Sequence, residues 1–216
     1  MPKILITRPE HDDTTHYLSH WSRQAIDLAE KKGIKVFDLH RENANKQKFQ
    51  GIIQKQKPDF VIFNGHGSAD KIGGHKEEIL IQSHRDEKTL NKMIVYAHTC
   101  SAAKILGPLA VAEGAISFLG YDEDFIFFYD PKKMTKPLQD ETARIFLEPS
   151  TEAISSIIKG NTVEEAQKRA KDLFLRSISR MLSTEASEEE TSMVRYLFWD
   201  MRHLILCGEK EAKLLA

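Results

Sequence analysis

The sequence has few cysteines and no long apolar segment. Cys100 and Cys207 are the only cysteines among 216 residues, and their spacing matches no disulfide framework, so we expect two free thiols in a reducing compartment. The apolar runs, such as Ile4-Leu5-Ile6 near the amino terminus, are too short for a signal-peptide core or a membrane span. We therefore expect a cytoplasmic protein that does not associate with membranes.

The chain also lacks an excess of charge of either sign. Its 31 basic and 32 acidic residues leave a formal net charge of -1, which provides no global field to attract nucleic acid. Apolar residues make up 41% of the chain and charged residues 29%, values typical of folded and not of disordered proteins. The length predicts one sizeable domain over residues 1–216.

Short apolar segments alternate with longer amphipathic ones along the chain. This alternation predicts an α/β fold, a three-layer sandwich with a mostly parallel central sheet of about six strands and helices on both faces. One helix is expected over residues 101–113, and a small hairpin between residues 66 and 85. The expected strands are residues 3–7, 34–39, 60–64, 93–97, 115–120 and 204–208.

Two of these strands end at residues that can do chemistry. Residues 60–64 lead into Gly65-His66-Gly67, and residues 93–97 lead into Cys100. Because the carboxyl ends of parallel strands meet at one edge of a sheet, we expect the histidine and the thiol to act there as base and nucleophile. A helix starting after Cys100 would favour its thiolate form. The backbone N–H groups of Gly67 and Cys100 are candidates for an oxyanion hole.

Each of these residues also has a simpler interpretation. A single strand-end cysteine or histidine more often belongs to the core than to a catalytic site. Here the two occur on consecutive strands, with glycine on both sides of the histidine, and this coincidence favours the catalytic interpretation. Cys207 has no histidine at the end of its strand, so we expect it to pack in the core.

The two strand ends resemble the fingerprint of the caspase and gingipain clan of cysteine peptidases, clan CD. In that clan an apolar strand ends in His-Gly, here residues 60–67, and another ends in the catalytic cysteine, here residues 93–100. Residues 112–120, 160–166 and 199–208 are similar to the gingipain-like and CHAT-domain branch. The resemblance implies a caspase-like fold that hydrolyses peptide bonds through an acyl-enzyme. His66 and Cys100 would be the dyad, and the substrate a peptide or protein.

Five residues are candidates for binding the substrate. By resemblance to the clan, Arg8 and His98 lie at the pocket for the residue before the cut, where they suit an acidic side chain. Many relatives carry an acidic or amide residue at the position of His98. Asp122 and Asp124 instead suit Arg or Lys, and Asn64 lies at the end of its strand. We expect no cofactor, with Ca²⁺ bound by the oxygens of residues 122–124 as an alternative.

A group of metal-ligand residues lies near the amino terminus. His11, Asp12, His16 and His20 are close in sequence, and His16 and His20 share one face of the expected helix. No third ligand has a clear spacing relative to those two histidines. We therefore expect an exposed helix start and no metal site.

Two other functions remain open. A receiver-like signalling module fits the alternation of strands and helices and the pair Asp12-Asp13, but its acceptor aspartate is replaced by Asn64. A peptidase-like scaffold that binds a regulatory protein partner without cutting it is the second. If the chain is a peptidase, the exposed turn at Lys132-Lys133 and the loop over residues 68–85 are candidate self-cleavage sites.

Overall fold

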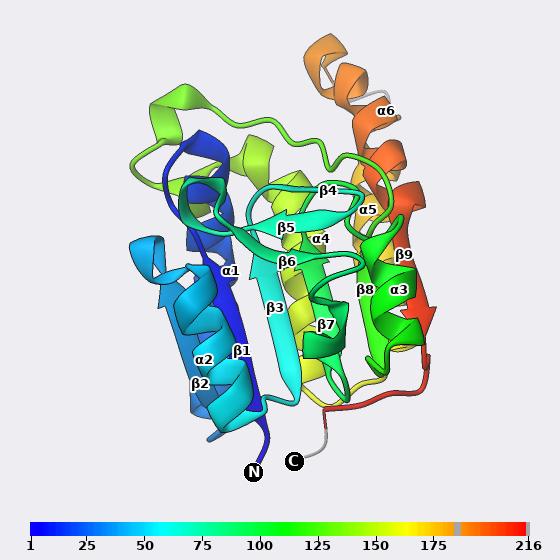
Figure 1. The fold of residues 1–216 in the computed structure, drawn as a ribbon. Coiled ribbons are helices and arrows are strands. Elements are labelled where there is room, and N and C mark those ends of the chain that lie inside the picture. The colour runs from blue at the N-terminus through cyan, green and yellow to red at the C-terminus, as the bar shows by residue number, and fades with distance from the viewer. Residues whose placement is uncertain (184–186, 215–216) are drawn as a thin grey trace.

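A six-stranded sheet forms the centre of the molecule (Figure 1). The computed structural model describes residues 1–183 and 187–214. The strands are β1 (Lys3–Arg8), β2 (Lys35–His40), β3 (Phe60–Asn64), β7 (Ile94–His98), β8 (Ser117–Tyr121) and β9 (Leu204–Gly208). They lie in the order β2-β1-β3-β7-β8-β9, and every pair is parallel except β8 with β9. The mostly parallel sheet expected from the sequence is therefore confirmed.

Helices cover both faces of this sheet. The α-helices are α1 (Asp13–Lys31), α2 (Lys46–Gln56), α3 (Leu106–Ala112), α4 (Glu141–Ile158), α5 (Val163–Met181) and α6 (Glu188–His203), with 3₁₀ turns at Arg41–Asn43, His75–Glu77, Glu87–Leu90, Pro131–Lys133 and Pro137–Gln139. Helices α1, α4 and α5 bury Ile6 and Ile62 on one face, and α2 and α3 bury Leu5 and Val61 on the other. Consecutive residues of one strand thus face opposite helix layers. Because both layers are buried, the strands are continuous apolar runs in the sequence.

A second, smaller sheet lies over the upper ends of β3 and β7 (Figure 1). It consists of β4 (Gly67–Ser68), β5 (Lys71–Gly73) and β6 (Ile79–Gln82), joined in antiparallel order. Ile72 and Ile81 are buried in the same cluster as Phe63. The hairpin expected after His66 is present and gains a third strand.

The segment directly after Cys100 is not the helix that the sequence predicted. Helix α3 begins only at Leu106, and Ser101 has a left-handed backbone with a φ of 55°. The Ser101 and Ala103 N–H groups donate to the carbonyls of Glu123 and Tyr121, at 3.1 and 2.9 Å. These bonds to the end of β8 and to the residues just after it take the place of helical ones, so the helix predicted over residues 101–113 is wrong for residues 101–105.

A long connection, residues 122–140, crosses the carboxyl edge of the sheet (Figure 1). It binds helix α1 through the Tyr129 hydroxyl, which donates to Asp13 at 2.9 Å. It also binds α6 through the Ile126 N–H, which donates to the buried Asp200 carboxylate at 3.0 Å. Within the described ranges, no helix is long and apolar enough to cross a membrane.

Candidate active site

The segments that carry His66 and Cys100 lie side by side at the carboxyl edge of the sheet. Asn64 of β3 pairs with His98 of β7, and the Gly65 N–H donates to the His98 carbonyl at 3.3 Å. His66 and Cys100 each follow two residues after this last pair. Their coming together is therefore a consequence of the parallel register of β3 and β7.

Gly67 lets the two segments approach closely. A Cβ added to Gly67 would lie 2.9 Å from the Thr99 Cβ and 3.1 Å from the Cys100 carbonyl oxygen. Real Cβ atoms do not approach side-chain carbon so closely without something moving. Glycine is required here because the backbone after His66 packs directly against the Thr99 side chain and the Cys100 carbonyl oxygen.

The His66 side chain is held by Asp12. Its Nε2 lies 2.6 Å from the Asp12 Oδ2, while the other Asp12 oxygen caps α1 by accepting from the Thr15 N–H at 2.7 Å. Burial alone would raise the pKa of Asp12, but the hydrogen bonds from Thr15 and His66 outweigh it and lower this pKa. The carboxylate is thus ionised and can only accept, so the His66 Nε2 carries a proton; in the neutral imidazole the Nδ1 then has the lone pair.

The sequence prediction missed this carboxylate as a partner of the base. Asp12 caps α1, and its contact with His66 spans 54 positions in the chain. A usable signal was its position just after β1, because β1 is the neighbour of β3 in the sheet. Residues that follow neighbouring parallel strands share one edge.

The Cys100 thiol is only partly exposed, and its nearest hydrogen-bond partner is a carbonyl. Its Sγ lies 3.9 Å from the carbonyl oxygen of Phe125, to which it donates. Burial raises the pKa of this thiol, and Asp124 and Asp200 add to the rise. The thiolate expected from a helix start is therefore not supported, since that helix start is absent and the environment favours the neutral thiol.

No hydrogen bond joins the His66 and Cys100 side chains in the described parts of the chain. The Nδ1 of His66 likewise has no hydrogen-bond partner among the described residues. Catalytic hydrogen bonds are often long or absent before substrate binds. The arrangement is compatible with a dyad whose thiol has still to turn from Phe125 to His66.

The backbone N–H groups of Gly67 and Cys100 are not used in backbone hydrogen bonds among the described residues. Because the Gly73 N–H donates to His66 and Gly67 is paired with Ile72, the alternation of an antiparallel ladder turns the Gly67 N–H away from β5. The Cys100 N–H donates to no backbone group among the described residues, whereas the next one, of Ser101, is taken by Glu123. Gly67 and Cys100 therefore remain the candidate donors.

Three of the expected substrate-binding residues lie inside the protein. The Arg8 side chain is 4% exposed and forms an ion pair with Asp38 at 2.5 Å. Asn64 is fully buried and its amide donates to the Thr7 carbonyl at 3.0 Å. His98 is buried beside Phe125, with ring centroids 4.5 Å apart, and burial lowers its pKa to about 3. None of the three presents a charge to solvent.

The two acidic candidates lie nearer to the surface. Asp122 binds His203 through its Oδ1 at 2.8 Å. Asp124 is exposed, accepts a hydrogen bond from the Ser101 hydroxyl at 2.8 Å, and raises the pKa of the adjacent Cys100. Since Glu123 pairs with Lys104, the carboxylates of residues 122–124 each have a different partner and do not converge on one cation.

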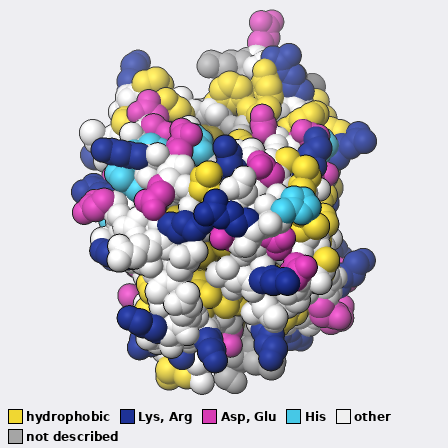
Figure 2. Space-filling model, in the orientation of Figure 1, with side chains coloured by type: hydrophobic (Ala, Val, Ile, Leu, Met, Phe, Trp, Pro, Cys, Tyr) yellow, Lys and Arg dark blue, Asp and Glu magenta, His cyan; other side chains and the backbone are white. Residues whose placement is uncertain are grey.

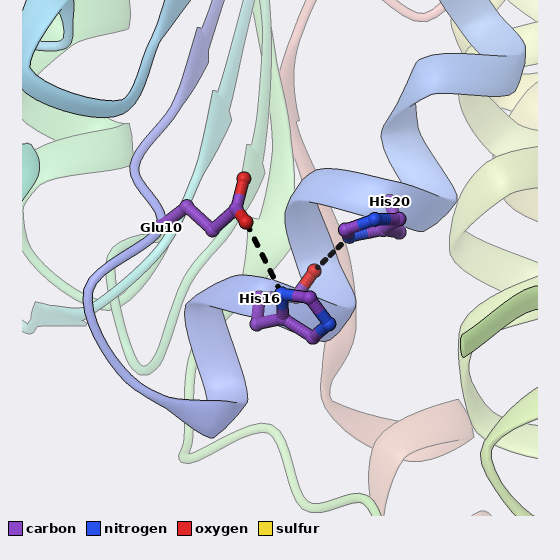
Figure 3. A group of neighbouring side chains, drawn as sticks. All are labelled: Glu10, His16 and His20. Carbon is purple, nitrogen blue, oxygen red and sulfur yellow. Dashed lines mark hydrogen bonds and ion pairs between the residues drawn. The ribbon is translucent and has the colours of Figure 1, made fainter. Parts of the chain in front are cut away.

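The histidines near the amino terminus form two separate groups. Glu10, His16 and His20 make up the first, and the His16 Nδ1 lies 3.2 Å from the Glu10 carboxylate (Figure 3). The second consists of His11 and Asp12, which follow β1, with His66, which follows the neighbouring strand β3. Figure 2 shows histidine side chains beside acidic and basic ones where β1 leads into α1. The four residues considered together in the sequence are thus divided by the fold.

A surface hollow of about 880 Å³ lies away from these groups, between α1, α4 and α5. Its lining includes Trp21, Arg144 and Arg169 and contains neither His66 nor Cys100. Residues of both charges line it, and no cysteine or histidine is among them. We therefore place the candidate site at the strand ends and not in this hollow.

Comparison with known proteins gives a distant likeness to solved structures. No family model and no curated protein matches the chain. A similar solved structure is described as the X-ray structure of an inactive zymogen C11 protease from Parabacteroides distasonis. The two chains are 12% identical, the match covers 92% of this chain and 81% of that one, and the TM-score is 0.42. A likeness this distant assigns no role to any residue of this chain.

Proposed function

We propose that the chain is a cysteine endopeptidase in which Cys100 is the nucleophile and His66 the base. The observation that carries the proposal is the hydrogen bond from His66 to Asp12, 2.6 Å long. His66 follows strand β3, and Cys100 follows the neighbouring strand β7. A base oriented by a carboxylate and adjacent to a thiol is the arrangement that acyl transfer requires.

The proposed reaction begins from the neutral thiol. The sulfur attacks the carbonyl carbon of the peptide while the thiol proton passes to the His66 Nδ1, and the Gly67 and Cys100 N–H groups bind the resulting oxyanion. The imidazolium then gives this proton to the leaving amine as the C–N bond breaks, which leaves a thioester on Cys100. Water, deprotonated by His66, hydrolyses the thioester and restores the thiol.

We further propose that the site prefers a basic side chain before the cut. Arg8 and His98 offer no accessible positive charge, because Arg8 is paired with Asp38 and His98 is buried and neutral. Asp124 is exposed beside the thiol. An exposed carboxylate at this position favours Arg or Lys by charge.

The sequence resemblance to clan CD, and to its gingipain-like and CHAT-domain branch, supports the same proposal. The motif residues of that resemblance, His66, Gly67 and Cys100, are the ones whose segments lie in contact. We include in the proposal a single domain over residues 1–216, a cytoplasmic location, and control by self-cleavage or by a protein partner.

A non-catalytic scaffold is the second candidate function. It is favoured by the hydrogen bond of the Cys100 thiol to Phe125 and by its raised pKa, which describe an inactive nucleophile. The receiver-like alternative has less support, because Asn64 replaces its acceptor aspartate and is fully buried.

Digestion of a mixed peptide library separates these functions. Wild type, Cys100→Ala and the matched control Cys207→Ala are incubated with the library, and new termini are identified by mass spectrometry. The peptidase predicts cuts by wild type and Cys207→Ala that disappear in Cys100→Ala. Absence of such cuts, or their persistence in Cys100→Ala, would rule out the proposed peptidase.

A further inference from the structure

Three imidazole nitrogens near His66 are buried without hydrogen-bond partners. They are both ring nitrogens of His11 and the Nδ1 of His75, and none has a partner among the described residues. Buried polar atoms are nearly always satisfied, so each exception indicates a missing partner such as a water or an ion. The two histidines pack together, with ring centroids 5.3 Å apart. Their three unpartnered nitrogens therefore lie in one small region of the protein.

The ionised carboxylate of Asp12 and the candidate catalytic base, His66, lie in the same region. One possible ligand atom from each of His11, Asp12 and His66 lies within 4.8 Å of the others. The Asp12 Oδ2 is 2.6 Å from the Nε2 of His66 and 3.6 Å from the Nε2 of His11. The side chains of His66 and Asp12 are 35% and 38% exposed, so an ion has a path from solvent.

We propose that His11, Asp12 and His66 bind a divalent transition-metal ion of the zinc class, with His75, which packs against His11, as an outer-shell partner. Imidazole nitrogens and a carboxylate oxygen are ordinary ligands of Zn²⁺. In a tetrahedral zinc site, with bonds of about 2.0 Å, the ligand atoms are about 3.3 Å apart. The contact between Asp12 and His66 has only to lengthen slightly to admit the ion.

The surroundings prepare these ligands for a metal. The Asp12 carboxylate is oriented by the backbone N–H and the hydroxyl of Thr15, at 2.7 and 2.8 Å, which is the kind of outer support that metal ligands need. Both ring nitrogens of His11 are buried without a partner among the described residues, so a neutral His11 ring has an unused lone pair for coordination.

The group of Glu10, His16 and His20 is less suited to a metal. The His16 Nε2 already donates to the Met134 carbonyl at 2.8 Å, and the Glu10 carboxylate already binds Arg41 at 3.0 Å. None of these polar atoms is left unsatisfied. An ion there would compete with existing bonds and with the positive charge of Arg41, whereas at His11 it would satisfy groups that have no partner.

Metal binding at His66 would switch the enzyme off, a consequence that rests on the proposed function. A neutral imidazole carries one proton, which in the free site lies on Nε2 and points to Asp12. A metal on Nε2 forces that proton onto Nδ1, the nitrogen that must accept the thiol proton. The ion would thus turn the base into a hydrogen-bond donor without touching Cys100.

Titration of the full chain with Zn²⁺, followed by calorimetry, tests the site. We expect one site in wild type whose affinity falls at least about tenfold in His11→Ala and in His75→Ala, since even lost outer-shell partners cost 10–100-fold. Co²⁺ in place of Zn²⁺ should show a visible absorption band that the two variants lose. Circular dichroism verifies folding, and His75→Ala provides a second test if His11→Ala does not fold.

His20→Ala is the matched control, because it removes a histidine from the other group. Unchanged binding in His20→Ala supports the proposal, whereas binding lost there and kept in His11→Ala overturns it, as does the absence of Zn²⁺ binding in wild type. These readouts need no substrate. If Zn²⁺ binds but the metal-free protein cuts no peptide, the metal site stands and only the proposed peptidase fails.

Discussion

Asp12 and His66 are 54 positions apart in the chain, and a 2.6 Å contact joins the Oδ2 of one to the Nε2 of the other. The same carboxylate begins helix α1 through its second oxygen. A single carboxylate therefore connects helix α1, which covers one face of the sheet, to the candidate base His66. This relationship leads to the first of five predictions.

Replacing Asp12 by asparagine should separate these two roles. Asparagine caps helices as well as aspartate does, so the thermal midpoint should change little. The amide has no charge to hold the Nε2–H tautomer, and we expect kcat to fall at least about a hundredfold, as when triad carboxylates are made neutral. The control Thr15→Ala should lower stability by about 1 kcal/mol with a much smaller loss of kcat. Equal kcat in Asp12→Asn and wild type would contradict the assigned role.

The raised pKa of Cys100 predicts a slow reaction with iodoacetamide. Burial favours the neutral thiol, so less thiolate is present at pH 7 than in a free cysteine. The rate should rise about tenfold per pH unit between pH 7 and 9, because the thiolate fraction rises that way below the pKa. Peptide mapping by mass spectrometry measures Cys100 and Cys207 in one experiment. A Cys100 that reacts faster than glutathione at pH 7 would show that the thiolate is already formed.

Gly67→Ala should impair both folding and catalysis. Its methyl group would meet the Thr99 Cβ at 2.9 Å, and forcing such contacts costs about 1–3 kcal/mol. Because the movement displaces the segment that carries Cys100, peptide cleavage should fall as well. Gly51→Ala is the control: no atom lies within 4 Å of the added carbon, and alanine inside helix α2 should stabilise by about 0.5–1 kcal/mol. Urea unfolding measures both, and a neutral Gly67→Ala would refute the close approach.

Asp124→Asn should reduce the preference for basic side chains. A hydrogen bond to a charged group contributes about 1.5–3 kcal/mol, so kcat/KM for Arg and Lys substrates should fall about 10–100-fold. Neutral substrates should be affected far less. Asp122→Asn is the matched control, because its carboxylate is already bound to His203 at 2.8 Å. The comparison uses paired fluorogenic peptides, and an equal loss for basic and neutral substrates would remove Asp124 from the specificity site.

Self-cleavage, if it occurs, should fall in the connection that crosses the site. Lys132 and Lys133 are exposed in a short 3₁₀ turn, and exposed turns are where chains are cut. Intact mass after storage should show two fragments for wild type and none for Cys100→Ala. The double variant Lys132→Ala/Lys133→Ala should stay whole while still cutting added peptides. Identical intact masses for wild type and Cys100→Ala would exclude self-cleavage.

The sheet was predictable because its strands are buried on both faces. Each strand, such as Phe60–Asn64, is an apolar run of the right length between polar or glycine-containing segments, and this signal is local. The positions of His66 and Cys100 at strand ends followed directly, since parallel strands align their carboxyl ends. The contact between Gly65 and His98 agrees with that inference.

The partners of the side chains could not be predicted from the sequence, because they lie on segments that are distant in the chain. Residues 101–105 are of types common in helices. The Ser101 and Ala103 N–H groups nevertheless donate to the carbonyls of Glu123 and Tyr121, and helix α3 begins only at Leu106. The charge of Arg8 is neutralised by Asp38, 30 positions away. No local pattern reports such pairings, because they are set by which strands become neighbours.

The order of apolar and polar segments by itself determined the layers, the strands and the edge at which His66 and Cys100 meet. The tertiary structure alone decided that Asp12 binds the base, that the thiol lies half-buried against Phe125, and that the unpartnered nitrogens of His11 and His75 lie near each other. The physical reason is that the pattern of buried and exposed residues is local to each segment. Protonation states and metal ligands depend instead on short distances between groups that are far apart in the chain.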